Sequence, residues 1–394
     1  MHIEMVNEYS TNINWILEKQ DDGTFFISGW DKDSKILNID SQIIEDSLNN
    51  REHQNSYIMS KDMYETKKLI VNNFEKNNYS INSSCFTIVA NGTSAAFISL
   101  LQMFKRGIQN ILFIGPIYFT YYHLLKMYHK KMFYWNINPF SELSIDFNLL
   151  ENEINKNNIK CIIITLPFFG TGLTLDMKEL EELSYICTHN NIFLIIDYVY
   201  GNMEWKTPNK LHNYYLVDMT LKSEYCILYE SIPKRIFLNG MKSAIIYSTS
   251  DIIKQINKDS EICQGSISFI QESLLNSVYE DKNNSLLIKT LQKAVSYAQN
   301  NYYLIKSLLI DTDFLVCNSN SGYFSLIAIP TKHFVSKHDK DIAIEIYQKC
   351  KILTIPHSRY YYSLPNYYCF RINLSLETSD LIYNIKKLLY ICNK

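Results

Sequence analysis

Short apolar runs, separated by helical patterns, constrain the fold of this chain more than any other feature of its sequence. These runs of Ile, Leu, Val and Phe lie at residues 85–89, 111–114, 160–165, 192–197, 225–228 and 244–247. The spacing of apolar residues predicts helices at 61–74 and 95–104, and Asp176 is the predicted N-cap of another helix. Strands that are apolar on both faces are typical of a largely parallel sheet with helices on both sides. We therefore predict an α/β fold with its ligand site beyond the carboxyl ends of the strands.

The pattern changes after about residue 275, from alternating strands and helices to long helices with short strands. The elements predicted there are helices at 280–309 and 341–350 and strands at 323–327, 352–355 and 369–372. We therefore predict a large ligand-binding domain at 51–275 and a small α+β domain at 276–394. Residues 1–50 are polar, with weak strand patterns at 24–27 and 35–39, and we expect them to pack with the small domain.

The overall composition argues against several classes of function. The 394 residues carry a formal net charge of −2, which provides no general field to attract nucleic acid or an acidic membrane. Nine scattered cysteines without a CxxC pair argue against a disulfide framework or a zinc ribbon, and the histidines lack metal-ligand spacing. The N-terminus lacks the pattern of a signal peptide, and the apolar runs are too short to span a bilayer. We expect a cytoplasmic protein without a metal site, a nucleic-acid partner or a membrane segment.

A lysine between two of the apolar runs is the first candidate for chemistry. Lys234 lies in the stretch 229–242, which joins the predicted strands at 225–228 and 244–247. Burial disfavours the charged form of a lysine, so a lysine in such a place is costly unless something uses it. A neutral, desolvated lysine is also the form that makes a Schiff base with an aldehyde cofactor.

Further segments place polar or aromatic residues just beyond predicted strands. Residues 91–94 join a strand to a helix, and their N–H groups suit a phosphate, although an ordinary capped helix start is the simpler explanation. Tyr118 suits either stacking on a flat ring or packing in the core. Asp197 ends a strand of Ile, Leu and Phe, where a buried carboxylate needs a partner such as a protonated ring nitrogen; a helix cap is the alternative. Tyr200 would then reach a phenolic oxygen on the same ring.

Taken in order, these segments resemble those of the fold-type I pyridoxal-phosphate enzymes, the aspartate aminotransferase superfamily. The resemblance covers roughly residues 57–375. It implies a seven-stranded type of mainly parallel sheet in the large domain, pyridoxal 5′-phosphate as cofactor, and a homodimer with its active site at the subunit interface. The resemblance also implies three catalytic residues: Lys234 as the lysine that carries the cofactor, Asp197 as the partner of the pyridine nitrogen, and Tyr200 as a donor to the ring hydroxyl oxygen.

The same resemblance implies residues that bind the rest of the cofactor and the substrate. Tyr118 matches the aromatic residue that stacks on the ring. The phosphate-binding positions of the family are matched by Gly92, Thr93, Ser231 and Lys242, and by Tyr57 for the phosphate of the neighbouring subunit. Arg371, in a predicted strand near the C-terminus, matches the arginine that binds the substrate α-carboxylate, which suits its forked guanidinium group. An arginine on a strand more commonly makes a surface ion pair.

Two residues depart from the pattern of the family. Phe169 stands where the family usually has an asparagine that binds the ring hydroxyl, which leaves Tyr200 as the side-chain donor. Lys242 stands where the family usually has an arginine, so the charge is kept and the planar fork is lost. Arg235 is a candidate to compensate. Neither departure removes the predicted catalytic residues.

The resemblance implies an aminotransferase that moves an amino group from an amino acid to a 2-oxo acid. The two departures keep a second hypothesis open, namely a lyase, cyclase or oxidase that acts on an amino acid in specialised metabolism with the same cofactor. A third hypothesis is a protein that keeps the fold and binds an amino acid without turnover. The fold by itself does not decide among them.

Overall fold

The computed structural model describes residues 3–5, 23–30, 45, 55–104, 107–206 and 210–392. Its larger part is built on an eight-stranded sheet with the order β1-β5-β4-β6-β7-β8-β9-β3. These strands are β1 (Ile3–Met5), β3 (Phe86–Ala90), β4 (Asn110–Ile114), β5 (Lys131–Trp135), β6 (Cys161–Thr165), β7 (Phe193–Asp197), β8 (Cys226–Glu230) and β9 (Ser243–Tyr247). Strands β5, β4, β6, β7 and β8 run parallel, whereas β9 is antiparallel to β8 and β3, and β1 is antiparallel to β5. The predicted α/β fold with a mainly parallel sheet is confirmed.

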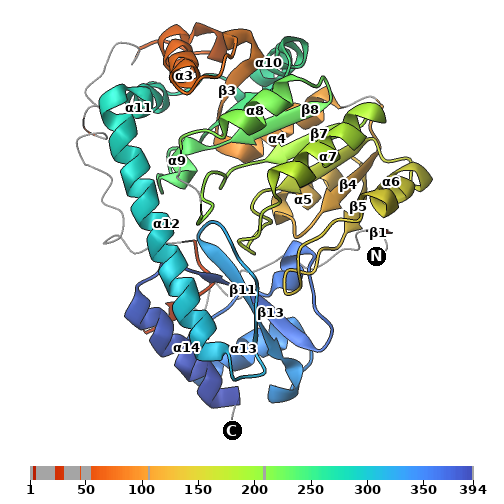
Figure 1. The fold of residues 1–394 in the computed structure, drawn as a ribbon, viewed down its shortest axis with the longest axis vertical. Helices are drawn as coiled ribbons and strands as arrows, with labels where there is room; N and C mark the ends of the chain where they lie inside the picture. Colours follow the sequence, from red (N-terminus) through yellow and green to blue (C-terminus); the bar gives the residue numbers. More distant parts are fainter. Residues whose placement is uncertain are drawn as a thin grey trace.

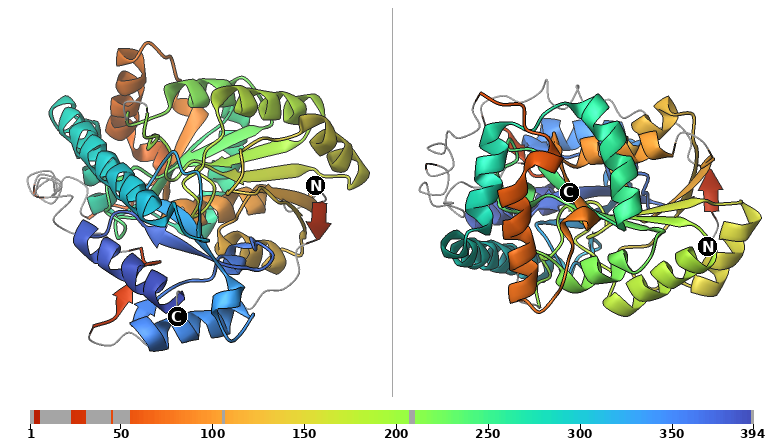
Figure 2. Two further views of the ribbon diagram at one scale, coloured as in Figure 1. Left: turned by 60° about the horizontal axis from the view of Figure 1, so that its bottom comes forward. Right: turned by 90° about the horizontal axis from the view of Figure 1, so that it is seen from above.

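Helices cover both faces of this sheet (Figure 2). One face packs against α6 (Phe147–Lys156), α7 (Met177–His189) and α8 (Tyr214–Leu221), and the other against α4 (Gly92–Met103), α5 (Phe119–Met127) and α10 (Ser250–Gln264). Successive residues of a strand therefore pack in different hydrophobic cores: Ile162 and Ile164 lie in the core on one face of the sheet, and Ile163 lies in the core on the other face. Because both faces are buried, these strands are apolar at almost every position.

A long helix joins this domain to a smaller one (Figure 1). After α11 (Phe269–Tyr279), helix α12 (Asp281–Leu309) carries Leu287 into the core of the large sheet and Tyr302 into a second core. The second core also contains side chains of α13 (Asp339–Cys350) and α14 (Thr378–Cys392). Its three-stranded antiparallel sheet has the order β10-β11-β13, with β10 (Leu315–Val316), β11 (Phe324–Pro330) and β13 (Tyr367–Asn373).

Two described pieces of the N-terminal segment pair with different parts of the molecule. Strand β1 extends the large sheet, whereas β2 (Phe25–Phe26) pairs in parallel with β12 (Ile352–Leu353) of the small domain. The predicted strand at 24–27 is therefore present as β2, and the one predicted at 35–39 lies outside the described residues. That residues 1–50 as a whole pack with the small domain stays a prediction.

Helix boundaries follow local capping. The helix predicted at 61–74 is α3 (Tyr64–Lys76), which a short 3₁₀ turn, η1 (Ser60–Asp62), precedes. Helix α4 begins at Gly92, earlier than predicted, and its N-cap Asn91 takes a left-handed conformation. The predicted N-cap of α7 is confirmed: Asp176 accepts a 2.9 Å hydrogen bond from the Glu179 backbone, and the Glu179 carboxylate accepts one in return. Within the described part of the chain, no helix is long and apolar enough to cross a membrane.

Candidate active site

The predicted catalytic residues lie just past the carboxyl ends of two neighbouring strands. Asp197 is the last residue of β7 and lies opposite Tyr229 of β8. Lys234 follows β8 in the short helix α9 (Ile232–Arg235), which lies at the edge of the large domain that faces β11 (Figure 1). Tyr200 follows β7, and Nζ of Lys234 lies 5.2 Å from the centre of its ring. Loops after adjacent parallel strands therefore bring the lysine and the tyrosine together.

Asp197 is almost fully buried, and its hydrogen bonds come from uncharged donors. The hydroxyl of Tyr121 donates to Oδ2, and the backbone N–H of Val199 donates to Oδ1 at 3.2 Å. Burial raises the pKa of Asp197 to about 6, although these hydrogen bonds and the charge of Lys234 act in the opposite direction. The hydroxyl of Tyr121 also bonds to that of Tyr229, so two buried phenols extend the network beneath the carboxylate.

The surroundings of Lys234 favour its charged form. Interaction with the Tyr200 phenol, and then with Tyr118 and Asp197, raises the pKa of Lys234, although burial and the charge of Arg371 lower it. Burial alone therefore does not leave Lys234 neutral, contrary to the expectation from the sequence. The tertiary structure places acidic groups around the amine, and these outweigh desolvation.

The predicted phosphate-binding positions converge at the start of α4. Strands β3 and β9 pair Ala90 with Ser243, so Gly92 and Lys242, which follow and precede this pair, lie side by side. Gly92 has a φ of +77°, and a Cβ at this position would lie 3.5 Å from Cβ of Lys242. Ser231 joins the group through a 2.8 Å hydrogen bond from its hydroxyl to the Ser243 carbonyl. Thr93 occupies the first turn of α4, where backbone N–H groups lack helical partners and favour an anion.

Arg371 lies on β13 and is surrounded by aromatic rings from other segments. Its side chain is fully buried, and its Nε and Nη2 donate to the Ser28 carbonyl at 3.0 and 2.9 Å. Its Cζ lies 4.4 Å from the ring centre of Trp30, 4.6 Å from that of Phe324 and 5.7 Å from that of Phe169. The Phe324 ring, 4.6 Å from Cζ of Arg371, is 5.8 Å from the Tyr200 ring, so the predicted carboxylate-binding residue lies near the other candidate residues. Because Arg371 is buried, it does not form the surface ion pair that an arginine on a strand more commonly makes.

Comparison with known proteins identifies the family. A model of the aminotransferase class I and II family matches residues 39–388. The chain belongs to this family. A single mutant of Thermus thermophilus aspartate aminotransferase superposes with a TM-score of 0.80 at 12% identity, covering 98% of this chain and 97% of that one, which shows a shared fold.

The curated relatives of this aminotransferase-family chain are distant. The probable N-acetyl-LL-diaminopimelate aminotransferase of Bacillus subtilis is 22% identical over 56% of this chain, and the match spans only 54% of that relative's length. A 1-aminocyclopropane-1-carboxylate synthase of Cucurbita maxima is 26% identical over 57% of this chain and 46% of its own length. Identity at this level does not fix a substrate.

The cofactor of the aminotransferase family is pyridoxal phosphate, and the residues described above fit it. Because residue 92 is a glycine, the space between Lys242 and the N-terminus of α4 stays free of a side chain, and a phosphate fits there. Asp197 takes its hydrogen bonds from a phenol and a backbone N–H, so a protonated ring nitrogen would supply the opposite charge. Tyr118 and Phe169, with ring centres 5.2 Å apart, provide flat apolar surface at the same site.

Two further candidate residues make no contact with the site among the described residues of this single chain, and the role of Tyr57 toward a neighbouring subunit stays a prediction. Tyr57 is 88% exposed, and no interaction within the described part of the chain joins it to the other candidate residues. Arg235 does not compensate for Lys242, because its guanidinium is buried in an ion pair with Glu230. Glu230 also bonds to His212 and Tyr247. Burial alone would raise the pKa of Glu230, but the charges of His212 and Arg235 lower it to about 2.

Sequence reasoning missed the buried polar residues that surround Asp197 and Lys234. Tyr121, Tyr229, Glu230 and His212 were not singled out for any role in the site. A signal was present for Tyr229, because aligning the ends of two parallel strands places it opposite Asp197. Tyr121 lies one helical turn after Tyr118, and this spacing puts both on one side of α5. The contacts of His212 depend on the path of a loop, for which the sequence has no comparable signal.

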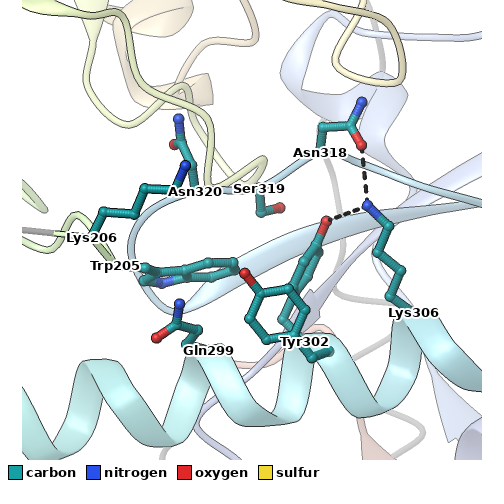
Figure 3. Close-up of a pocket in the computed structure, with 9 residues that line it drawn as sticks. Trp205, Lys206, Gln299, Tyr302, Lys306, Asn318, Ser319 and Asn320 are labelled. Carbon is teal, nitrogen blue, oxygen red and sulfur yellow. Dashed lines mark hydrogen bonds between the residues drawn. The ribbon is translucent and has the colours of Figure 1, made fainter.

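A separate pocket of about 240 Å³ lies between α12 and the segments 205–206 and 318–320 (Figure 3). Gln299, Tyr302 and Lys306 of α12 line it together with Trp205. Its wall is tied to the loop that carries Phe169, since the Ser319 hydroxyl donates to the Thr171 carbonyl at 2.6 Å. None of the candidate active-site residues lines this pocket.

Proposed function

We propose that this protein is an aminotransferase that transfers the amino group of an amino acid to a 2-oxo acid. The observation that carries the proposal is the position of Lys234, whose Nζ lies 5.2 Å from the Tyr200 ring and within reach of the charges of Asp197 and Arg371. An amine between a carboxylate and an arginine suits proton transfer on a substrate that the arginine holds. The family supports the same reaction class.

Each residue of the site would have a distinct role in cofactor binding. Asp197 would hold a proton at the ring nitrogen, and Tyr200 would donate to the ring oxygen. Tyr118 would stack on the ring. The start of α4 with Gly92 and Thr93, together with Ser231 and Lys242, would hold the phosphate. Bound pyridoxal phosphate supplies the electron sink that stabilises negative charge at the substrate α-carbon.

Substrate handling would fall to Arg371 and Lys234. Arg371 would bind the α-carboxylate. Its Nε and Nη2 each donate a hydrogen bond to the Ser28 carbonyl, and the remaining N–H groups of the guanidinium are available to a carboxylate. Lys234 would move the proton at the substrate α-carbon: Nζ in its uncharged form would take the proton as general base and hold it for return. The aromatic rings around Arg371 exclude water, which strengthens its interaction with a carboxylate.

The decisive experiment measures consumption of a panel of amino acids by the purified holoenzyme with and without added 2-oxo acids. We expect consumption to require the 2-oxo acid, with stoichiometric formation of the new amino acid. Release of ammonia or of a cyclic product without an acceptor would overturn the proposal. The Lys234→Ala variant serves as the control, and it should lose turnover in either case.

One specific observation favours a second candidate, a lyase or cyclase that acts on an amino acid with the same cofactor. Phe169 is 8% exposed and packs between Tyr118 and Tyr360, with ring centres 5.2 and 4.7 Å away, so an apolar ring stands at the site of a usual hydrogen-bond donor. One relative is named as a 1-aminocyclopropane-1-carboxylate synthase. The acceptor experiment separates this candidate from the aminotransferase. A protein without turnover would consume no amino acid under either condition.

A further inference from the structure

The pocket between α12 and the segments 205–206 and 318–320, here called the α12 pocket, has the size of a small-molecule site (Figure 3). Its volume is about 240 Å³, whereas a cavity of about 150 Å³ is enough to bind benzene. The space therefore admits one six-membered ring that carries a polar substituent. The α12 pocket shares no lining residue with the candidate active site.

Two aromatic side chains that line the α12 pocket are held in place by their polar atoms. Nε1 of Trp205 donates to the Gly322 carbonyl at 3.1 Å, and the Tyr302 hydroxyl donates to the Cys317 carbonyl at 2.9 Å. The two ring centres lie 4.8 Å apart, and Tyr302 is only 3% exposed. Because both polar atoms are already bonded, the two rings offer the pocket an apolar surface that suits a third flat ring.

The charged side chains of the α12 pocket are both cations. Lys206 and Lys306 lie on either side of Trp205 and Tyr302 in Figure 3, and the described residues that line the pocket include no carboxylate. Nζ of Lys306 lies 3.4 Å from the Tyr302 hydroxyl and 3.4 Å from Oδ1 of Asn318, and both of these partners are uncharged. The pocket therefore carries positive charge that an anionic ligand would neutralise.

Uncharged amides complete the lining of the α12 pocket. Gln299 and Asn320 both contribute side chains to it, and Oδ1 of Asn320 accepts a 3.2 Å hydrogen bond from the Thr174 backbone. The amide nitrogens of the two side chains are donors that suit carboxylate oxygens. Charge and hydrogen-bonding capacity in the pocket thus favour the same kind of ligand group.

We propose that the α12 pocket binds a single-ring aromatic carboxylate, with the ring against Trp205 and Tyr302 and the carboxylate at Lys306. A phosphate ion would use the charges and leave the rings uncovered, whereas an uncharged ring would leave the lysines without an anion. The site lies apart from the proposed reaction. Its test measures binding rather than turnover, so failure of the aminotransferase proposal would leave it in place.

Fluorine NMR of the holoenzyme labelled with 5-fluorotryptophan locates binding to a single pocket. The chain has four tryptophans, and replacing each by phenylalanine assigns its resonance. Trp205 reports on the α12 pocket, whereas Trp30, whose ring centre is 4.4 Å from Cζ of Arg371, reports on the candidate active site. We expect benzoate to shift the Trp205 resonance in a saturable manner, independently of any shift at Trp30. The fully buried Trp135 should not respond.

Three further ligands test the chemical class. Benzamide has the shape of benzoate without its charge, and we expect it to bind at Trp205 about fivefold more weakly, as one exposed charge pair provides. Cyclohexanecarboxylate keeps the charge without the flat ring and should bind about threefold more weakly or less. Inorganic phosphate should leave the Trp205 resonance in place. The absence of a saturable benzoate shift at Trp205 would overturn the proposal, and so would equal midpoints for benzoate and benzamide or for benzoate and phosphate.

Matched variants of α12 complete the test. Lys306→Gln removes an exposed charge and should raise the benzoate midpoint at Trp205 about fivefold, with no change in the response of Trp30. Lys293→Gln removes an exposed charge from the same helix outside the pocket and should change neither response. An unchanged midpoint at Trp205 in Lys306→Gln would contradict the role of this lysine and overturn the proposal.

Discussion

At the scale of single residues, the candidate site depends on the pKa of one buried carboxylate, that of Asp197. Asp197 is only 3% exposed, and burial raises the pKa of its carboxyl group above the ordinary value. The Tyr121 hydroxyl and the Val199 N–H limit this effect, so that the pKa is about 6. Burial raises the pKa of Tyr121 well above its usual value, so the phenol stays neutral and remains a donor. The carboxylate is therefore ionised at neutral pH and ready to pair with a cation.

Replacing Tyr121 tests this account. Binding of pyridoxal phosphate to the cofactor-free protein should need ionised Asp197, so its affinity should fall as the pH drops through about 6. Tyr121→Phe removes a hydrogen bond that lowers the pKa, so the midpoint should move upward by about one pH unit. The measurement is a series of absorbance titrations from pH 5 to 9. Tyr122→Phe, at a buried neighbour on the same helix, should leave the midpoint in place.

Replacing Gly92 tests the phosphate cradle. Gly92→Ala places a Cβ next to Lys242 and forces alanine to a φ of +77°, which costs about 1–2 kcal/mol of stability. We expect the affinity for pyridoxal phosphate to fall about tenfold or more, and that for pyridoxal, which lacks the phosphate, to change little.

The matched control is Gly265→Ala. Gly265 has a φ of +68°, and nothing lies within 4 Å of its added Cβ. This variant also places an alanine at a positive φ, without filling the cradle. Equal losses of cofactor affinity in both variants would contradict a phosphate site at Gly92.

At the scale of elements, a buried charge network fixes α9 to the end of β8. Glu230 pairs with Arg235 of α9, and Arg235 also donates to the carbonyl of Leu211. Glu230 bonds to His212 and Tyr247 as well, so the helix that carries Lys234 is tied to a loop and to β9. The cost of burying these charges is offset by the hydrogen bonds among them.

Glu230→Gln should destabilise the protein by about 3 kcal/mol, because it leaves Arg235 buried without an anion. Denaturation with urea at pH 7 would measure this loss. Replacing both partners, as in Glu230→Gln with Arg235→Leu, should recover part of it. A single variant as stable as the natural protein would show that the network does not hold α9.

The same network predicts how stability depends on pH. The folded-state pKa of Glu230 is about 2, below its ordinary value of 4.5, so its contribution is fully present above about pH 4.5. This contribution should be lost as the pH falls from about 4.5 to 2. The difference in unfolding free energy between the natural protein and Glu230→Gln should therefore shrink over this range.

The elements themselves were predictable to different degrees. Strands such as β6 and β7, apolar on both faces, and helix α12, with its sustained apolar spacing, were predicted close to their observed bounds. Strand β5, with the sequence KMFYW, was missed because aromatic and polar residues replace the aliphatic run. The strand conformation of β5 depends on its pairing with β4, which its local sequence does not indicate.

At the scale of the whole molecule, the site is assembled from both domains and the N-terminal segment. The large domain provides Asp197 and Lys234 to the candidate site, whereas Arg371 comes from the small domain. Ser28, which accepts two hydrogen bonds from Arg371, is 343 residues away in sequence. Any movement of one domain against the other along α12 would therefore change the distance between Arg371 and Lys234.

We expect the protein to be a homodimer in which Tyr57 reaches the cofactor phosphate of the neighbouring subunit. Light scattering after size exclusion should give about twice the chain mass of 46.3 kDa. Tyr57→Phe should weaken pyridoxal phosphate binding although the side chain is 88% exposed in one chain, and Tyr64→Phe, at 73% exposure, should not. A monomer with full cofactor affinity would contradict both expectations.

The sequence by itself determined the sheet type and the residues that each strand end presents, because strand burial and strand order along the chain are local properties. It therefore predicted Lys234, Asp197 and Tyr200 as neighbours. Only the tertiary structure decided their charge states and the burial of Arg371 among aromatic rings. The charge of a buried group depends on which distant segments pack around it, and packing over hundreds of residues leaves no periodic signal in the chain.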